Sequence, residues 1–165
     1  MKTRITVLLL MSLMMLPVVA DESMPGEESS PASHRRPSPD NAEVTFVELR
    51  DGDTVPMTFE VKFLIQGMGI APAGSDIENT GHHHLLIDVE ELPDPNLPLP
   101  ASENLIHFGG GQTETTLTLP EGEHTLQLVF ADYSHTPHDP VVKSKKTTVQ
   151  VSANAPAPTK EKEEG

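Results

Sequence analysis

The chain of 165 residues is 36% hydrophobic and 4% aromatic and contains 16 prolines, which limits it to one modest domain with long irregular segments. Its formal charge of −14, from 11 basic and 25 acidic residues, argues against nucleic acid and against an anionic membrane surface as partners. The chain has no cysteine, so disulfides, zinc–thiolate sites, iron–sulfur clusters and a thiol nucleophile are excluded, and any metal site must use histidine, carboxylate or methionine.

Residues 1–20 have the pattern of an export signal. Two basic residues precede an apolar run from Ile5 to Leu16, and Val18 and Ala20 occupy the positions that signal peptidase reads. The run is too short for a stable membrane span, and no cysteine is present to carry a lipid anchor. We expect cleavage after residue 20 and a soluble periplasmic or secreted bacterial protein without a stable membrane anchor.

The two flanks of the remaining chain offer little apolar surface to bury. Residues 21–42 are acidic and rich in proline and serine, and residues 152–165 contain an Ala-Pro repeat followed by alternating lysine and glutamate. Such segments cannot offset the entropy lost on ordering. We therefore expect a disordered leader and a disordered tail around a domain that spans residues 43–151.

The central region shows the periodicity of short strands separated by turns, and no convincing helical periodicity. In the clearest strand Met57, Phe59, Val61, Phe63 and Ile65 alternate with mostly polar residues, which predicts one core face. The predicted strands are residues 43–50, 57–66, 82–90, 104–108, 112–119, 123–131 and 141–151. Seven strands in a segment of this length predict an all-β fold, a small immunoglobulin-like sandwich.

Three consecutive histidines, His82 to His84, begin the third predicted strand. Residues two apart share a face of a strand, so His82 and His84 should lie side by side and His83 should point the other way. Leu85 and Ile87 share the face of His83, which predicts that this face is the core side. The same three histidines are also consistent with partly solvated groups that bond to nearby carboxylates and carbonyls.

In an immunoglobulin-like sandwich, the loops after the second, fourth and sixth strands gather at one end. Six of the eight histidines would therefore meet at one pole, namely His82, His83, His84, His107, His135 and His138. Met68, in the first of these loops, would lie there too. The residues predicted to bind a metal ion at this pole are His82, His84, His107, His135 and His138.

Other polar residues have simpler interpretations. His124 is predicted at the opposite pole, where its ring bonds back to the backbone of a turn. Asp88 and Asp139 are candidates for carboxylates that orient a metal-bound histidine, and turn or solvent positions explain them equally well. Residues 109–111 are three glycines that lack the strand–helix setting and the lysine of a phosphate cradle, so they predict a flexible turn.

Three segments, GHHHLLID, IHFGGGQTETTLTLPEGEHTLQL and SHTPHDP, resemble a family of exported bacterial proteins known as the domain of unknown function 4399. The resemblance covers about Val44 to Val151. The family name supplies no activity, and the resemblance implies a periplasmic or secreted β domain. The residues that fall in the motif segments are His82, His83, His84, His107, Gly109, Gly110, Gly111, His124, His135 and His138.

The leading interpretation is a binding module for copper or zinc, because imidazole suits both ions and histidine is the natural ligand in an exported protein without thiolates. Met68, a soft ligand, gives copper a slight preference. A metal-dependent envelope enzyme is the alternative, since a histidine-bound metal with an open position can activate water. A third interpretation is a metal-free domain that contacts envelope proteins or glycans, although one tyrosine and no tryptophan weaken glycan stacking.

Overall fold

The structure, a computed structural model, describes residues 34–155. The predicted export signal at residues 1–20, residues 21–33 of the predicted leader and residues 156–165 of the predicted tail lie outside the described residues. Residues 34–155 contain no helix that is long and apolar enough to cross a membrane.

The described chain forms strands and no helix, as the sequence predicted. In order they are β1 (Glu43–Val47), β2 (Asp53–Val55), β3 (Thr58–Gln66), β4 (Gly69–Ile70), β5 (Thr80–Ile87), β6 (Leu105–His107), β7 (Glu114–Thr118), β8 (Gly122–Ala131), β9 (Pro137–Lys143) and β10 (Thr147–Val151). The short strands β2 and β4 were not predicted. The predicted last strand is divided into β9 and β10, and β9 begins inside the segment that was predicted as a loop.

Ser144 explains why β9 and β10 are separate strands. Its hydroxyl accepts a hydrogen bond from the backbone N–H of Leu128 at 2.9 Å, and its own N–H donates to the Leu128 carbonyl at 2.9 Å. The Gln127 side chain donates to the Ser144 carbonyl at 2.9 Å. A side chain thus takes the place of one ladder hydrogen bond, and the regular pairing of β8 is interrupted there.

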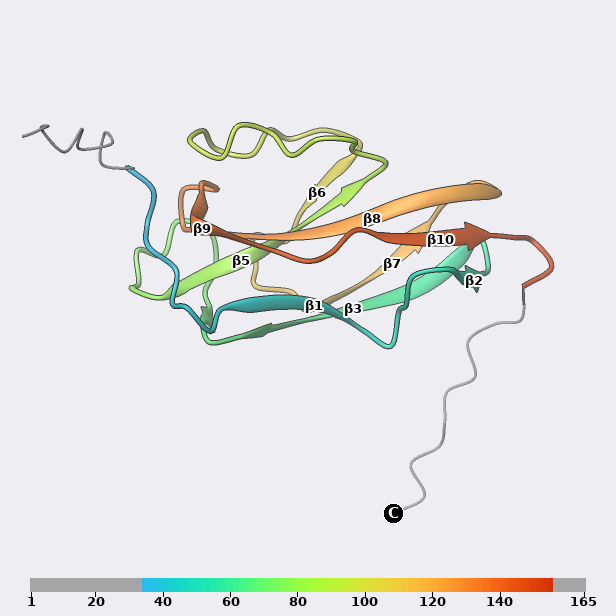
Figure 1. The fold of residues 1–165 in the computed structure, drawn as a ribbon, viewed down its shortest axis with the longest axis horizontal. Coiled ribbons are helices and arrows are strands. Elements are labelled where there is room, and N and C mark those ends of the chain that lie inside the picture. Colours follow the sequence, from blue (N-terminus) through green and yellow to red (C-terminus); the bar gives the residue numbers. More distant parts are fainter. Residues whose placement is uncertain (1–33, 156–165) are drawn as a thin grey trace, which may run out of the picture. The chain divides into compact units, whose positions relative to one another are not determined.

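The strands form two sheets that pack face to face, which confirms the predicted sandwich. The smaller sheet has the order β1-β3-β7, and the larger has the order β2-β10-β8-β5-β4, with β6 beside β5 and β9 beside β8. Figure 1 shows β5, β8 and β10 on one side and β1 and β3 on the other. Strands far apart in sequence, β5 and β8, are neighbours along six residue pairs of the larger sheet.

The main core lies between the two sheets. The inward residues of β3, namely Phe59, Val61, Phe63 and Ile65, are buried as predicted and pack with Leu126, Leu128 and Phe130 of β8. Met57 was expected to continue this face, but it is 40% exposed. It precedes the first residue of β3, so the alternation of the strand does not reach it.

The outer face of the larger sheet is covered at one end by the proline-rich connection of residues 88–104. Leu99 of this connection is buried in a second apolar cluster with Leu86, Leu105, Val129 and Ala131. Its backbone N–H donates to the His135 carbonyl at 2.9 Å. In Figure 1 the connection (yellow-green) lies on the side of β5 and β8 that faces away from β1 and β3. The sequence predicted an irregular connection here, but not that it would enclose part of the sheet.

Residues 34–42, which composition assigned to the leader, pack against β9. The Ser38 N–H donates to the Asp139 carbonyl at 3.0 Å, and the Asp139 N–H donates to the Arg36 carbonyl at 2.8 Å. Arg35 adds a hydrogen bond from Nε to the Pro137 carbonyl at 3.0 Å. Residues 34–42 are therefore part of the folded domain and not of a disordered leader. Composition did not predict this, because polar and backbone contacts hold the segment in place with little apolar burial.

Candidate metal centre

The histidines of β5 alternate between two environments, as predicted. The His83 ring lies in the main core, with its centroid 5.1 Å from the Phe63 ring and 5.0 Å from the Phe130 ring. The His82 and His84 rings lie on the outer face of the sheet, with their centroids 4.8 Å apart. The two-residue period of the strand therefore separates a core histidine from a histidine pair.

His107 joins this pair because β6 runs antiparallel to β5. Its backbone is directly opposite His84, and its ring centroid lies 5.1 Å from that of His84 and 4.9 Å from that of His82. The ring rests against Gly109, where an added Cβ would lie 2.3 Å from Cε1 and 2.6 Å from Nε2 of His107. The first of the three glycines thus makes room for the imidazole, a role that the sequence analysis missed.

His135 enters from the turn between β8 and β9. Its ring centroid lies 4.6 Å from that of His107 and 5.1 Å from that of His82. Its backbone has a φ of 70°, in the left-handed region that residues other than glycine seldom adopt. The buried Asp132 carboxylate stabilises this turn, because one of its oxygens accepts hydrogen bonds from the Ser134 N–H, the Ser134 hydroxyl and the Thr136 N–H at 2.7 to 3.0 Å.

The three loops that were predicted to gather at one end do so. The Ala73 N–H donates to the Gly109 carbonyl at 2.9 Å, and the Gly74 N–H donates to the Tyr133 carbonyl at 2.9 Å. These bonds join the loop before β5 to the loop after β6 and to the turn after β8. Sandwich topology, rather than nearness in sequence, brings the histidines together.

We call His82, His84, His107 and His135 the histidine pole. Their six pairs of ring centroids are separated by 4.6 to 5.9 Å. Ligand-type nitrogens of His82, His107 and His135 all lie within 4.8 Å of one another, so these three residues could hold a metal ion. The His84 ring lies beside them, although its nitrogens fall outside that group of three.

The two histidines of the pole that belong to β5 are buried and largely unpartnered. His82 is 0% exposed and His84 is 1% exposed. Neither ring nitrogen of His82 has a hydrogen-bond partner, and Nδ1 of His84 has none. Burial, followed by repulsion from His107 and His135, lowers the pKa of His82 to about 4. Burial, followed by repulsion from His82 and His107, lowers the pKa of His84 to about 3. Both rings are therefore neutral at pH 7, the form that binds metal.

The outer two histidines connect the pole to solvent. His107 is exposed and His135 is partly exposed. Partial desolvation, followed by repulsion from His135, lowers the pKa of His107. Asp132 is the carboxylate near the pole, since its charge raises the pKa of His82 against these effects. The sequence analysis missed Asp132, although its spacing from Ser134 and Thr136 is typical of a carboxylate that caps a turn.

Asp88 and Asp139, the two candidates for carboxylates that orient a metal-bound histidine, have partners outside the histidine pole. Asp88 accepts hydrogen bonds from the Thr125 N–H at 2.9 Å and bonds to His124, and Asp139 is 3.6 Å from the guanidinium of Arg35. Neither orients a histidine of the pole, so that alternative was wrong for both. Asp88 has a φ of 56° and follows β5, which turns its side chain toward the far end of β8.

His138 and Met68 also lie outside the pole. The His138 ring stacks on Phe130 with an interplanar angle of 18°, is 1% exposed, and is absent from the group of three converging histidines. It belongs to β9 rather than to a loop, and that strand pairs with β8 on one side and with residues 36–38 on the other. Met68 is partly buried and packs against the main core.

His124 occupies the opposite pole and is bonded through both ring nitrogens. Nδ1 lies 2.7 Å from the Asp88 carboxylate and Nε2 lies 3.1 Å from the Pro120 carbonyl. The ring therefore connects β8 to the turn that precedes it, through Pro120, and to the turn that follows β5, through Asp88. This agrees with the predicted structural role.

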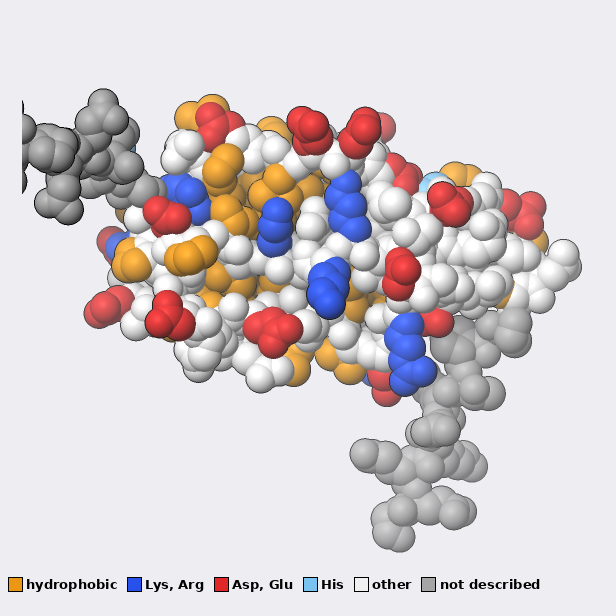
Figure 2. Space-filling model, viewed as in Figure 1, with side chains coloured by type: hydrophobic (Ala, Val, Ile, Leu, Met, Phe, Trp, Pro, Cys, Tyr) orange, Lys and Arg blue, Asp and Glu red, His pale blue; other side chains and the backbone are white. Residues whose placement is uncertain are grey.

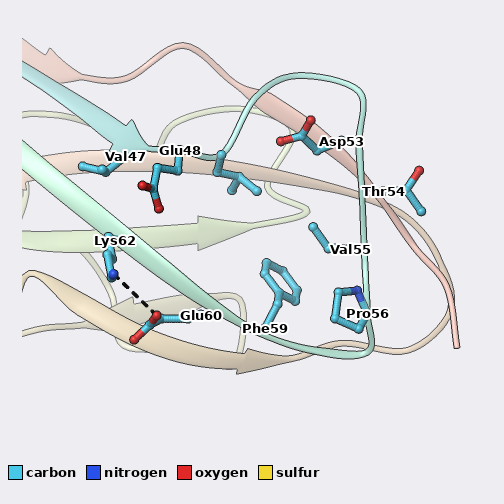
Figure 3. Close-up of a pocket in the computed structure, with 10 residues that line it drawn as sticks. Val47, Glu48, Asp53, Thr54, Val55, Pro56, Phe59, Glu60 and Lys62 are labelled. Atoms are coloured by element: carbon cyan, nitrogen blue, oxygen red, sulfur yellow. Dashed lines mark ion pairs between the residues drawn. The ribbon is translucent and has the colours of Figure 1, made fainter. Parts of the chain in front are cut away.

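A separate hollow of about 220 Å³ lies between the end of β1, the strand β2 and the start of β3. Figure 3 shows its apolar residues, Val47, Val55, Pro56 and Phe59, with charged residues around them. The ammonium of Lys62 lies 3.6 Å from the Glu60 carboxylate. No histidine is among the residues that line this hollow, so the hollow is separate from the histidine pole.

The face of the molecule in Figure 2 shows how the charges are distributed there. Basic side chains lie near the middle of that face, acidic side chains lie mostly toward its margins, and only a small area of histidine is visible.

Comparison with known proteins identifies a family. No curated protein and no solved structure matches the chain. The model of one family, described as "Domain of unknown function (DUF4399)", matches residues 61–152, a segment that contains the whole histidine pole. This match covers more than half of the chain and confirms the resemblance carried by the histidine motifs. The chain therefore belongs to the family of the domain of unknown function 4399.

Proposed function

We propose that the histidine pole binds one transition metal ion and that the domain is the metal-binding module of an exported protein. The observation that carries this proposal is the convergence of four imidazole rings from β5, β6 and the turn after β8. A buried imidazole nitrogen without a partner costs about 1–3 kcal/mol. A bound ion would remove that cost, because it supplies the missing partner.

The spacing of the rings favours a tetrahedral ion. With metal–nitrogen bonds of about 2.0–2.1 Å, ring centroids lie about 3.2 Å from the ion and about 5 Å from one another in a tetrahedron. Five of the six separations lie between 4.6 and 5.1 Å, and the sixth, between His84 and His135, is 5.9 Å. A square-planar ion would require two opposite pairs at about 6.4 Å. We therefore propose Zn(II) or Cu(I) rather than planar Cu(II).

In this proposal His82, His107 and His135 provide the first three nitrogens, and His84 provides the fourth after a change of ring orientation. The charges of the chain support a cation at this place. The buried Asp132 carboxylate acts on His82, and the formal charge of the chain is −14. A cation bound there is attracted by both.

Titration of the tag-free protein with Zn(II) tests the proposal, and Co(II) serves as a spectroscopic probe of geometry. We expect one ion per chain and the intense visible absorption of tetrahedral Co(II). His34→Gln, at the exposed start of the described chain, is the matched control that removes a histidine without touching the pole. Binding weaker than about 100 μM, or equal losses in His34→Gln and His82→Leu, would contradict the proposal.

Metal-dependent hydrolysis is a second candidate function, favoured by one observation. Ligand-type nitrogens of three residues converge without those of His84, and His107 is exposed. An ion with three protein ligands has an open position for water, as catalytic zinc sites do. Titration of the Co(II)-substituted protein with a small anion such as azide separates the two functions. A Co(II) spectrum that changes with azide favours the open site.

Export is part of the proposal and is supported by the pattern of residues 1–20. Intact-mass measurement of protein recovered from the bacterial periplasm checks it. We expect a chain that begins at Asp21, and a full-length precursor retained in the cell membrane would contradict export.

A further inference from the structure

We infer that residues 35–40 form a clasp that positions His135, and that Arg36 is its key positioning residue. This inference rests on the proposed metal function of the pole, but the clasp also has consequences in the metal-free protein. It assigns a role to a segment that precedes the family match at residues 61–152.

His135 is the member of the converging triad that no strand holds. His82 belongs to β5 and His107 to β6, whereas His135 lies in the turn between β8 and β9. Its backbone has a φ of 70°, a conformation that persists only when surrounding contacts enforce it. The position of this ligand therefore depends on whatever fixes the turn.

The backbone of the clasp is fixed in register beside the start of β9. Pro37 forms a parallel bridge with Asp139, and two backbone hydrogen bonds of 3.0 and 2.8 Å join Asp139 to Ser38 and Arg36. The Ser38 hydroxyl donates to the Pro140 carbonyl at 2.8 Å. Arg35 donates to the carbonyls of Pro137 and His138. These bonds set the position from which the Arg36 side chain extends.

The Arg36 side chain connects two of the loops at the pole. Its guanidinium carbon lies 4.9 Å from the centre of the Tyr133 ring, a cation–π contact, and its Nη2 pairs with the Asp76 carboxylate. Tyr133 is two residues before His135 in the turn, and its carbonyl accepts the Gly74 N–H at 2.9 Å. Arg36 therefore holds the turn and the loop before β5 against each other.

Two further bonds carry this restraint to His135. The His135 N–H donates to the Asp132 carbonyl at 2.9 Å, and the His135 carbonyl accepts the Leu99 N–H at 2.9 Å. The turn is thus held from the clasp, from the loop before β5 and from the proline-rich connection. Loss of Arg36 removes the first restraint and leaves the other two, so the turn loosens while the domain stays folded.

The test compares Arg36→Gln with Arg50→Gln, an exposed arginine in the loop between β1 and β2. We expect Arg36→Gln to speed chelator-driven loss of Zn(II) by about 3- to 10-fold, the range of a cation–π contact plus an exposed ion pair. Arg50→Gln should leave the rate unchanged. Tyr133→Leu should act as Arg36→Gln does, and Tyr133→Phe, which keeps the ring, should restore the wild-type rate.

A double-variant cycle shows whether Arg36 acts through His135. Asparagine tolerates the left-handed region, so His135→Asn removes the imidazole without a new backbone strain. In that background Arg36→Gln should have no further effect on Zn(II) loss. An equal effect with and without His135, or no effect in the wild-type background, would overturn the inference.

The clasp can also be tested without metal, which separates its failure from a failure of the proposed function. The His135 amide, bonded to the Asp132 carbonyl, should exchange its hydrogen faster in metal-free Arg36→Gln than in metal-free wild type. Unchanged exchange there would overturn the clasp. Absence of Zn(II) binding by the wild type would instead overturn only the metal function.

Discussion

The two ends of the sandwich use histidine in opposite ways. At one end His124 is bonded through both ring nitrogens, to Asp88 and to the Pro120 carbonyl. At the other end His82 is fully buried and both its ring nitrogens are without a hydrogen-bond partner. An imidazole with a hydrogen-bond partner for each nitrogen is accounted for by the fold. A buried imidazole without partners lowers the stability of the fold unless a ligand supplies them. This difference supports the proposal that the ligand binds at the end that contains His82.

Acid should destabilise the protein through its buried, unpartnered histidines. His82 and His83 have pKa values lowered to about 4, and His84 to about 3, from the 6.5 of the unfolded chain. Below pH 6.5 these three histidines therefore bind protons in the unfolded chain but stay neutral in the folded chain until the pH approaches 4. The contribution of these histidines to the stability of the metal-free protein is fully present above pH 6.5, and it falls by about 1.4 kcal/mol per pH unit and per histidine toward pH 4.

Denaturant midpoints between pH 7.5 and 4 measure this loss. The three histidines together lose about 10 kcal/mol between pH 6.5 and 4, which is comparable with the roughly 5–15 kcal/mol of a typical domain, so the midpoint should fall steeply with pH. His82→Leu should reduce the slope, and His34→Gln should not. A flat profile in the wild type would mean that these histidines are not held neutral by burial.

Exchange of one histidine for an apolar residue at each end should give opposite results. His82→Leu should lower Zn(II) affinity by at least about 100-fold, because one of the converging nitrogens is lost. It should also leave the metal-free stability unchanged or raise it by about 1 kcal/mol, since a buried unpartnered group is replaced by a packed one. His124→Leu should keep the affinity and lower stability by about 1–3 kcal/mol.

Calorimetric titration and thermal unfolding of the two variants check this pair. If His82→Leu destabilises the metal-free protein as much as His124→Leu does, then His82 has a structural role and the contrast between the two ends disappears.

Metal itself should stabilise the protein through the pole. At a free Zn(II) concentration of 100 times the dissociation constant, the gain is about 2.7 kcal/mol. The melting temperature should rise accordingly, and EDTA should reverse the rise. His82→Leu should show almost no shift, whereas His124→Leu should show the full one.

The smallest expected effect on Zn(II) affinity comes from Gly109, against which the His107 ring packs. Gly109→Ala would place a Cβ 2.3 Å from Cε1 of the imidazole, so the ring must move, and we expect about a 10-fold loss of Zn(II) affinity. Gly110→Ala is the matched control, because its Cβ meets the flexible Gln112 side chain at 3.2 Å. Equal affinities for the two variants would show that the ring position does not depend on Gly109.

The sequence predicted most of the longer strands and the faces of β3 and β5, because an alternation of two is a local property, but it missed β2 and β4. It also predicted that His82, His84, His107 and His135 would converge, because sandwich topology determines which loops meet. It could not place His138, because the start of β9 pairs with Ala131 of β8 and with residues 36–38, which composition had assigned to the leader. For the same reason it missed Asp132 and Gly109, whose roles depend on contacts across the chain.

The three converging histidines come from segments that are distant in the chain and are brought together only by folding. An ion shared by them would link those segments as disulfides link loops, in a protein that has no cysteine. Unlike a disulfide, this link is lost to a chelator or to acid. Resistance of the chain to proteases would then follow the local supply of metal. The protein would be long-lived where the ion is plentiful and short-lived where it is scarce.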